Sequence, residues 1–410
     1  VFGDNDFAAR FPSAVAAALT ALLIFAWGRR IANERLGWWA AIMFTVCLQS
    51  FIHGKAAVAD MWLVLFVTAA HWAGYELLRD QLASRSSQPS TLSSRWWWVF
   101  YLSLGFGFLA KGPIAWTPLL ALAVTKWFVP DLRLKPRFLF ATGLAVSISL
   151  ISIWAVPALV RTNGEFLQVG IGKHVVERSV IAMEGHGAQS LLGYVVSLPF
   201  YFVAIFVTFF PWSLKLPWLG KRLWRNRDPL DNYLLAGTGV VFLLFSLVKT
   251  KLPHYTLPAY PLLALLLARA LLEQPGSSQF VKRAASSGVA LALVAVLVSP
   301  WAARFFPAYD LAGQARADLR PEMDFGAVRY REPSLVWYFR RHVRGWFEEV
   351  DERFVPEFMA RPGPRFVVLP SRQADEAFST TPSGWKRYRT RGFNTANLKA
   401  VDLTLLLKPE

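Results

Sequence analysis

Basic side chains interrupt an apolar run in the stretch SLVKTKLPHYTLPAYP, residues 246–261. Lys249, Lys251 and His254 fall between two segments that are each apolar enough to enter a membrane. Two ammonium groups and an imidazole at headgroup depth suit a lipid phosphate, because charge-assisted hydrogen bonds strengthen where water is excluded. The prolines that follow break the helix and leave backbone groups that need a polar cavity. We expect a phosphate-binding site here. The alternative is a charged loop that only caps the ends of the two membrane segments.

An acidic residue stands at the start of another apolar segment, in FIHGKAAVADMWLV. Asp60 enters this segment with His53 and Lys55 close by in the chain. A carboxylate at the edge of hydrocarbon is costly and by default indicates function. The alternative is a structural pair with Lys55 or Arg10.

Lys111 separates two apolar segments in LAKGPIAW, where Gly112 and Pro113 predict a tight turn. A single lysine in a turn is a weak signal of function, and the side of the membrane on which it lies matters more than its type.

Two further candidates lie in the stretch 161–190. His174 and Arg178 are four residues apart, so on a helix they share one face, and the valines around them fit a helix in the membrane interface. An ordinary surface helix is an equally good interpretation. His186 could bind a metal with Glu184 or His174, although no paired ligand spacing supports such a site.

The elements that position these residues are membrane spans. Hydrophobic residues make up 54% of the 410 residues and charged residues only 17%, which is typical of a membrane protein. A span needs roughly 20 apolar residues. We predict about ten spans, and the fourth and fifth could form one hairpin. They are residues 12–28, 36–52, 59–77, 96–110, 113–130, 138–159, 191–212, 233–248, 255–273 and 284–303.

Charge sets the expected orientation. Basic loops stay in the cytoplasm, and the loops on one side of the predicted spans hold 17 Lys and Arg against eight on the other. The poorer side carries all of the candidate residues above, so we expect the site and the C-terminus to be extracytoplasmic. The net charge of +17 follows largely from the cytoplasmic loops. It gives no indication of nucleic-acid binding, because no basic stripe with interleaved aromatics stands apart from the spans.

The predicted type of structure changes after residue 303, from membrane spans to alternating strands and helices. Residues 1–303 are predicted to form the helical bundle, and residues 304–410 a small α/β domain outside the membrane. Strand-like stretches FGAVRY, RFVVLP and KAVDLTLLLK alternate there with helical patterns around SLVWYFRRHVRGWF and QADEAF.

In the order and spacing of its motifs, the chain resembles the GT-C superfamily of polyprenyl-phosphate-dependent glycosyltransferases. The similarity is to the branch of the lipid A 4-amino-4-deoxy-L-arabinose transferases and the protein O-mannosyltransferases. It is carried by FAARFPSAVAAALTALLIFAWGRRI, AVADMWLVLF, GFLAKGPIAWTPLLAL, GKHVVERSVIAMEGHG, FFPWSLKLP and KTKLPHYTLPAYPLLALLLARAL, which cover most of residues 2–273.

This resemblance implies inverting transfer of a sugar from a polyprenyl-phosphate donor to a lipid, glycan or protein acceptor on the periplasmic side of the bacterial inner membrane. By position, Asp60 matches the family's second acid, and Arg178 the arginine that holds the donor phosphate. His174 is offset by one residue from the family's histidine. Lys111, Lys249, Lys251, His254 and Tyr255 are expected to line the phosphate site, and a divalent metal is an open possibility.

The family's general base lies in the first outside loop, which would precede residue 1. We therefore expect the sequence to be a fragment that is inactive by itself. Two alternatives to transfer remain. A transporter or flippase of polyprenyl-linked sugars would show midplane polar residues and internal repeats, and a scaffold would use the bundle only as an anchor.

Overall fold

The structure is a computed structural model that describes the chain except at residues 1–2, 4, 83–93, 178–189, 331, 346 and 395–398. Two compact units make up the fold, residues 1–292 and 293–410. The first unit thus ends inside a helix, Ser277–Ala302, whereas the sequence places the boundary at residue 303.

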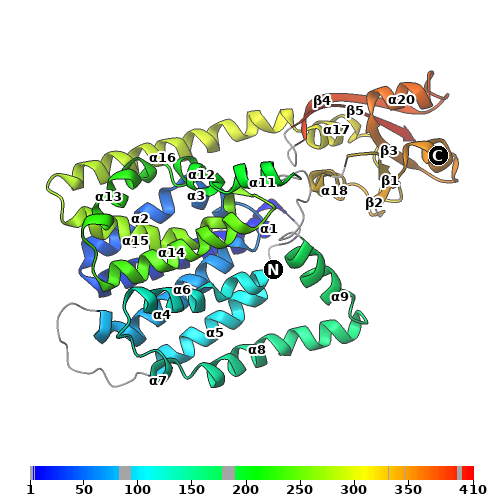
Figure 1. The fold of residues 1–410 in the computed structure, drawn as a ribbon. Helices are drawn as coiled ribbons and strands as arrows, with labels where there is room; N and C mark the ends of the chain where they lie inside the picture. The colour runs from blue at the N-terminus through cyan, green and yellow to red at the C-terminus, as the bar shows by residue number, and fades with distance from the viewer. Residues whose placement is uncertain are drawn as a thin grey trace. The chain divides into compact units, whose positions relative to one another are not determined.

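The first unit is a bundle of α-helices (Figure 1). Its longer helices are α1 (Asp6–Ile31), α2 (Glu34–Val46), α4 (Asp60–Leu82), α5 (Ser94–Lys111), α6 (Thr117–Phe128), α8 (Phe140–Arg161), α14 (Pro229–Leu247), α15 (Tyr260–Leu272) and α16 (Ser277–Ala302). Shorter elements are α3 (Leu48–Gly54), η1 (Gly112–Trp116), α7 (Lys135–Phe138), α9 (Glu165–Leu167), η2 (Gln168–Glu177), α11 (Leu191–Ser197), α12 (Phe200–Thr208), η3 (Trp212–Lys215), α13 (Leu216–Arg225) and η4 (Pro253–Ala259).

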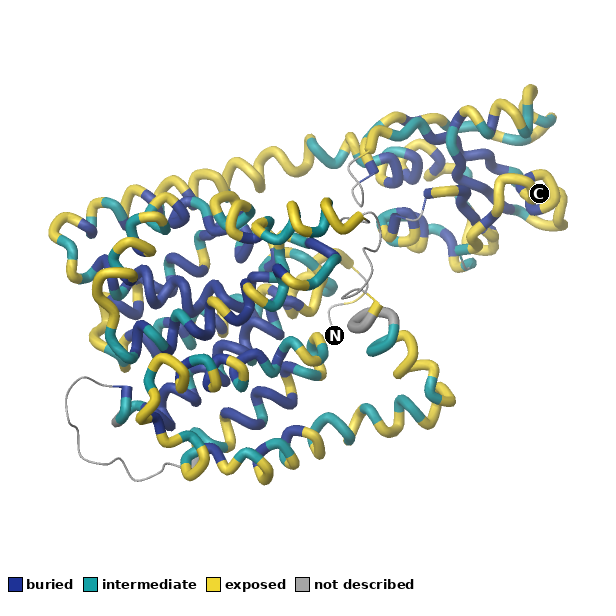
Figure 2. The backbone as a smooth tube through the Cα atoms, viewed as in Figure 1, coloured by how far each residue is buried: buried dark blue, intermediate teal, exposed yellow. Residues whose placement is uncertain are grey.

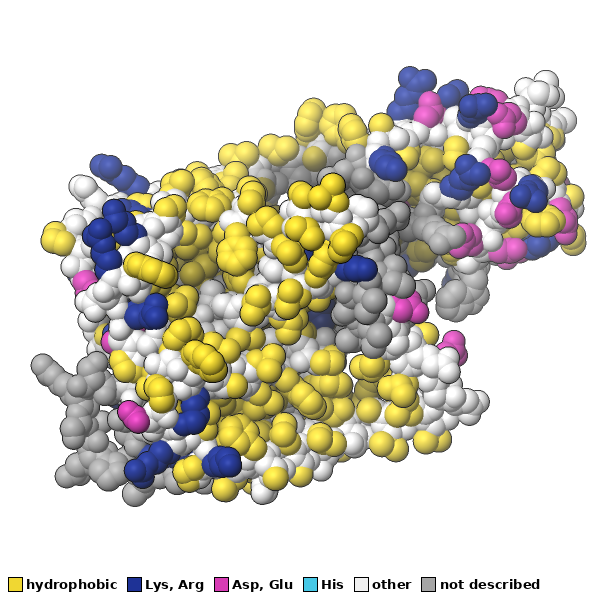
Figure 3. Space-filling view, in the orientation of Figure 1, with side chains coloured by type: hydrophobic (Ala, Val, Ile, Leu, Met, Phe, Trp, Pro, Cys, Tyr) yellow, Lys and Arg dark blue, Asp and Glu magenta, His cyan; other side chains and the backbone are white. Residues whose placement is uncertain are grey.

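Burial divides these helices into two groups, as the dark and light segments of Figure 2 show. Helix α15 is buried nearly all round, and α4 and α14 are buried over most of their length, so these three form the core. By contrast, α8 and α16 are strongly apolar yet mostly exposed. Apolar side chains also cover the visible face of the bundle, while Lys and Arg gather toward one end (Figure 3). This is the surface of a multi-span membrane protein, because lipid rather than water solvates it.

Seven helical stretches in the described residues are long and apolar enough to cross a membrane, and up to nine if each of two bent pairs is one span. The predicted second span is broken at Cys47, where α2 and α3 meet at 69°. The seventh is bent by 43° between α11 and α12, where Pro199 lacks the N–H that would continue the helix. The sequence predicts a span at each of these two places but reveals neither bend.

The predicted fourth and fifth spans form one helical stretch, Arg95–Phe128, which folds back on itself. Gly112 has a φ of +74°, which favours glycine, directly after α5 ends at Lys111. Past this turn, a Cβ on Gly107 would lie 2.8 Å from that of Ala115, so η1 packs against α5. Helix α6 then packs against α14 and α4.

The second unit is a small α/β domain, as the sequence predicts. Its five-stranded sheet has the order β2-β1-β3-β5-β4, with β1 parallel to β2 and β3 and the remaining pairs antiparallel. The strands are β1 (Asp324–Ala327), β2 (Phe347–Glu349), β3 (Arg365–Pro370), β4 (Lys386–Asn394) and β5 (Lys399–Lys408). The helices are η5 (Ala303–Phe305), α17 (Pro307–Ala315), α18 (Pro333–Phe339), η6 (Glu352–Phe354), α19 (Val355–Ala360) and α20 (Ser371–Ala377).

Alternation along β3 explains the two apolar layers of this domain. Phe366 and Val368 belong to the core on one face of the sheet, and Val367 and Leu369 to the core on the other. Successive side chains of a strand point to opposite faces, so helices must cover both.

Candidate functional site

The candidate site lies where the first turn of α4 meets the last turn of α5. These helices pack extensively against each other, and Lys111 is the last residue of α5 while Asp60 is the first of α4. The Lys111 ammonium forms an ion pair with Asp60 Oδ1. The Asp60 side chain is only 10% exposed, whereas that of Lys111 is 34% exposed. The carboxylate is therefore largely shielded, and the ammonium remains accessible.

The irregular segment between α14 and α15 supplies the next residue. His254 lies in η4, and its Nε2 is 3.9 Å from Asp60 Oδ1. The neighbouring Tyr255 places its ring 5.9 Å from the Lys111 ammonium, in cation–π contact. Four predicted residues, Asp60, Lys111, His254 and Tyr255, thus come together from segments far apart in the chain.

His53 joins this group from α3. Its ring centroid is 4.9 Å from that of His254, and its Nδ1 is 3.0 Å from the Gln49 amide nitrogen. The sequence indicated only that His53 precedes Asp60. Its part in the site depends on the bend at Cys47 and on η4, which no periodicity reveals.

His53, Asp60 and His254 have a geometry that fits a divalent cation. One ligand atom from each lies within 4.8 Å of the others, and two imidazoles with a carboxylate are ligands that zinc accepts. The Lys111 ammonium approaches the same Asp60 oxygen. An ion and Lys111 would therefore compete for this carboxylate.

Lys251 has a different environment from the one we expected. Its ammonium donates to the carbonyl oxygens of Phe245, Ser246 and Val248 at the end of α14. These carbonyls have no partner within the helix, so Lys251 satisfies the helix terminus. Burial lowers the pKa of Lys251 below its ordinary value.

The remaining predicted residues are placed less fully. Lys249 is half-buried just after α14, and none of the described residues bonds to it. His174 lies on the π-helical segment η2, but its side chain is outside the described part of the chain, as are Arg178, Glu184 and His186.

Comparison with known proteins shows a family and a solved structure that are similar to this chain. Residues 1–156 match the family described as dolichyl-phosphate-mannose-protein mannosyltransferase. The crystal structure of ArnT from Cupriavidus metallidurans bound to undecaprenyl phosphate superimposes with a TM-score of 0.71 at 17% identity, over 98% of this chain and 85% of that one. The chain therefore has the GT-C fold.

Two curated relatives are similar to this chain over most of its length. An undecaprenyl phosphate-alpha-4-amino-4-deoxy-L-arabinose arabinosyl transferase of Erwinia tasmaniensis is 30% identical over 319 residues, 75% of this chain and 55% of the relative. A second such transferase, from Sodalis glossinidius, is 28% identical over 352 residues, 82% of this chain and 60% of the relative. The chain therefore spans little more than half the length of these relatives.

Proposed function

We propose that the protein transfers a sugar from a polyprenyl-phosphate donor to an acceptor at the Asp60 end of the bundle. The observation that carries this proposal is the meeting of Asp60, Lys111 and His254 at one end of a GT-C bundle. The named relatives are transferases, which supports this function over a transporter of polyprenyl-linked sugars. Their names make an undecaprenyl-phosphate aminoarabinose the first donor to test, with lipid A as the first acceptor.

The chemistry assigns a role to each side chain. A nucleophile of the acceptor attacks the anomeric carbon, the bond from that carbon to the phosphate oxygen breaks, and polyprenyl phosphate leaves with the electron pair. The exposed ammonium of Lys111 stabilises the charge that grows on this phosphate. Asp60 holds the ammonium in place, and His254 is a second donor for the phosphate. The proton of the acceptor passes to a separate general base.

Orientation follows from charge. The basic loops fix the opposite end of the bundle in the cytoplasm, so the Asp60 end and residues 304–410 face the periplasm of a bacterial inner membrane. Membrane lipids surround the bundle, and a lipid, glycan or protein acceptor reaches the site from the periplasm.

A transfer assay tests the function. The protein is expressed from its gene, reconstituted in proteoliposomes and given a radiolabelled polyprenyl-phosphate sugar. Lys111→Met and Asp60→Asn should each lower transfer by about 100-fold, the usual loss for one preorganised charge-stabilising group. Lys282→Met is the matched control, since Lys282 is an exposed lysine of α16 remote in sequence from the site. Full transfer by Lys111→Met would refute the proposed role.

We also propose that His53, Asp60 and His254 can hold a divalent cation. Such an ion would supply Lewis-acid charge near the donor phosphate. Titration of the purified protein with Zn²⁺ should raise its unfolding temperature, and His53→Ala should remove most of that increase. An equal increase in the variant would exclude this ligand set.

A further inference from the structure

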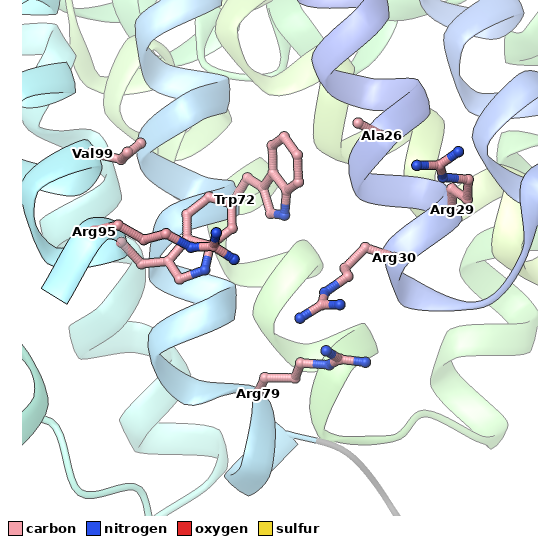
Figure 4. Close-up of a pocket in the computed structure, with 8 residues that line it drawn as sticks. Ala26, Arg29, Arg30, Trp72, Arg79, Arg95 and Val99 are labelled. Atoms are coloured by element: carbon pink, nitrogen blue, oxygen red, sulfur yellow. The ribbon is translucent and has the colours of Figure 1, made fainter. Parts of the chain in front are cut away.

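A pocket of about 580 Å³ opens at the other end of helices α1, α4 and α5. Four arginines and two tryptophans line it with two smaller apolar residues, and all eight are drawn in Figure 4. They are Arg29, Arg30 and Ala26 of α1, Trp72 and Arg79 of α4, and Arg95, Trp96 and Val99 of α5. The volume lies within the range of small-molecule sites.

Helix lengths place this pocket across the membrane from Asp60. Asp60 begins α4 and Arg79 lies near its end, which corresponds to about 28 Å at the rise of an α-helix. Likewise Arg95 and Lys111 stand at opposite ends of α5, about 24 Å apart. Since the hydrocarbon core is about 30 Å thick, the pocket lies at the opposite interface and is separate from the transfer site.

The charges around the pocket are only partly compensated. Arg30 Nε donates to Glu76 Oε1 at 3.2 Å, and Trp72 Nε1 donates to the same oxygen. The Glu76 side chain is 3% exposed, so it lies behind the pocket wall. Arg79 and Arg95 form no ion pair within the described residues, and Arg95 lies over the Trp96 ring at 5.3 Å. The pocket therefore carries a positive surplus.

The residues around the pocket favour a lipid over a soluble anion as its ligand. The Trp72 and Trp96 rings contact each other in a tilted arrangement, with their centroids 5.1 Å apart, and tryptophans are typical of the level of lipid headgroups. Val99 of α5 is an exposed apolar residue at this level. Guanidinium groups bind phosphate through paired hydrogen bonds, and basic pockets between spans on the cytoplasmic side suit anionic headgroups.

We infer that this arginine pocket binds the phosphate of an anionic glycerophospholipid. In Figure 4 the guanidinium groups of Arg30, Arg79 and Arg95 point into one space. Arg79 and Arg95 supply the charge for the phosphate, since neither forms an ion pair within the described residues. Arg79 also bonds to the Tyr75 side chain, and Arg30 is held by Glu76. The apolar residues at the rim contact the glycerol and upper acyl chains.

Native mass spectrometry of the detergent-purified protein tests this inference. Phosphatidylglycerol is titrated against the wild type and the variants Arg79→Gln and Arg95→Gln, with phosphatidylcholine as the neutral probe. Each variant should bind phosphatidylglycerol about fivefold more weakly, as expected for one basic residue at a membrane surface. Phosphatidylcholine binding should be weak and unchanged.

Arg225→Gln is the matched control, since Arg225 is an exposed arginine in the last turn of α13 and does not line the pocket. Arg95→Lys should retain most of the affinity for phosphatidylglycerol, because it keeps the positive charge. This result would show that the fold tolerates a substitution at position 95. Wild-type affinity in Arg79→Gln and Arg95→Gln, or an equal loss in Arg225→Gln, would overturn the site. Displacement of the lipid by millimolar inorganic phosphate would overturn the lipid assignment in favour of a soluble phosphate.

Discussion

Lys251 donates to the carbonyl oxygens at the end of α14. Its replacement should therefore lower the stability of the protein. Lys251→Met leaves buried carbonyls without partners, so we expect unfolding to become easier by about 1–3 kcal/mol. The midpoint of denaturant unfolding in detergent measures the change. Lys249→Met is the control: Lys249 has no bonded partner in the described chain, and we expect less than about 0.5 kcal/mol.

The same pair of variants separates the two interpretations of the KTK sequence. If Lys249 contacts the donor, Lys249→Met weakens polyprenyl-phosphate binding at unchanged stability. A Lys251→Met protein of wild-type stability that has lost donor binding would contradict the capping role.

Residue types singled out Asp60, Lys111 and His254, because charged side chains at the edge of hydrocarbon are rare and stand out in the sequence. Tyr255 was added only by the family resemblance. The partner of each residue could not be predicted. Asp60 pairs with Lys111 rather than with Lys55 or Arg10, since the packing of α4 against α5 decides which ammonium reaches it. The role of Lys251 also depended on the backbone path after α14, which sequence does not give.

At the scale of the elements, α8 can approach α5 closely only because Gly143 has no side chain. A Cβ there would lie 2.0 Å from the buried ring of Tyr101, whose hydroxyl donates to the Phe138 carbonyl. Gly143→Ala should therefore destabilise the protein by about 1–3 kcal/mol through overpacking. Thermal unfolding in detergent checks this.

Gly239→Ala in α14 is the matched control, because nothing lies within 4 Å of a Cβ at that position. It should be neutral or stabilise by up to about 1 kcal/mol, the difference in helix propensity. Equal destabilisation by both substitutions would show that loss of glycine itself, rather than contact with Tyr101, is responsible.

Hydropathy located the helices well because lipid requires long apolar segments. It missed the bend at Cys47, since that residue has ψ near 143° and an apolar composition gives no sign of it. It also missed strands β2 and β4. The first has only three residues, and the second is an edge strand rich in Arg and Lys, a composition that protects edges but hides the strand.

At the scale of the whole bundle, α4 and α5 connect two charged sites, one proposed for the sugar donor and the other for an anionic phospholipid. One end carries the Asp60–Lys111 pair and the other the arginine pocket. The central claim is that the donor phosphate binds at the first of these. Both ends could attract a phosphate, so activity loss alone does not locate the donor.

Photo-crosslinking locates it directly. A polyprenyl phosphate with a diazirine beside the phosphate is bound to the protein, irradiated, and the labelled peptides are identified by mass spectrometry. We predict labels within residues 53–60, 108–116 and 253–256, lost when unlabelled polyprenyl phosphate competes and strongly reduced in Lys111→Met. Labels confined to the peptides of Arg29, Arg79 and Arg95, with none near Asp60, would contradict the account.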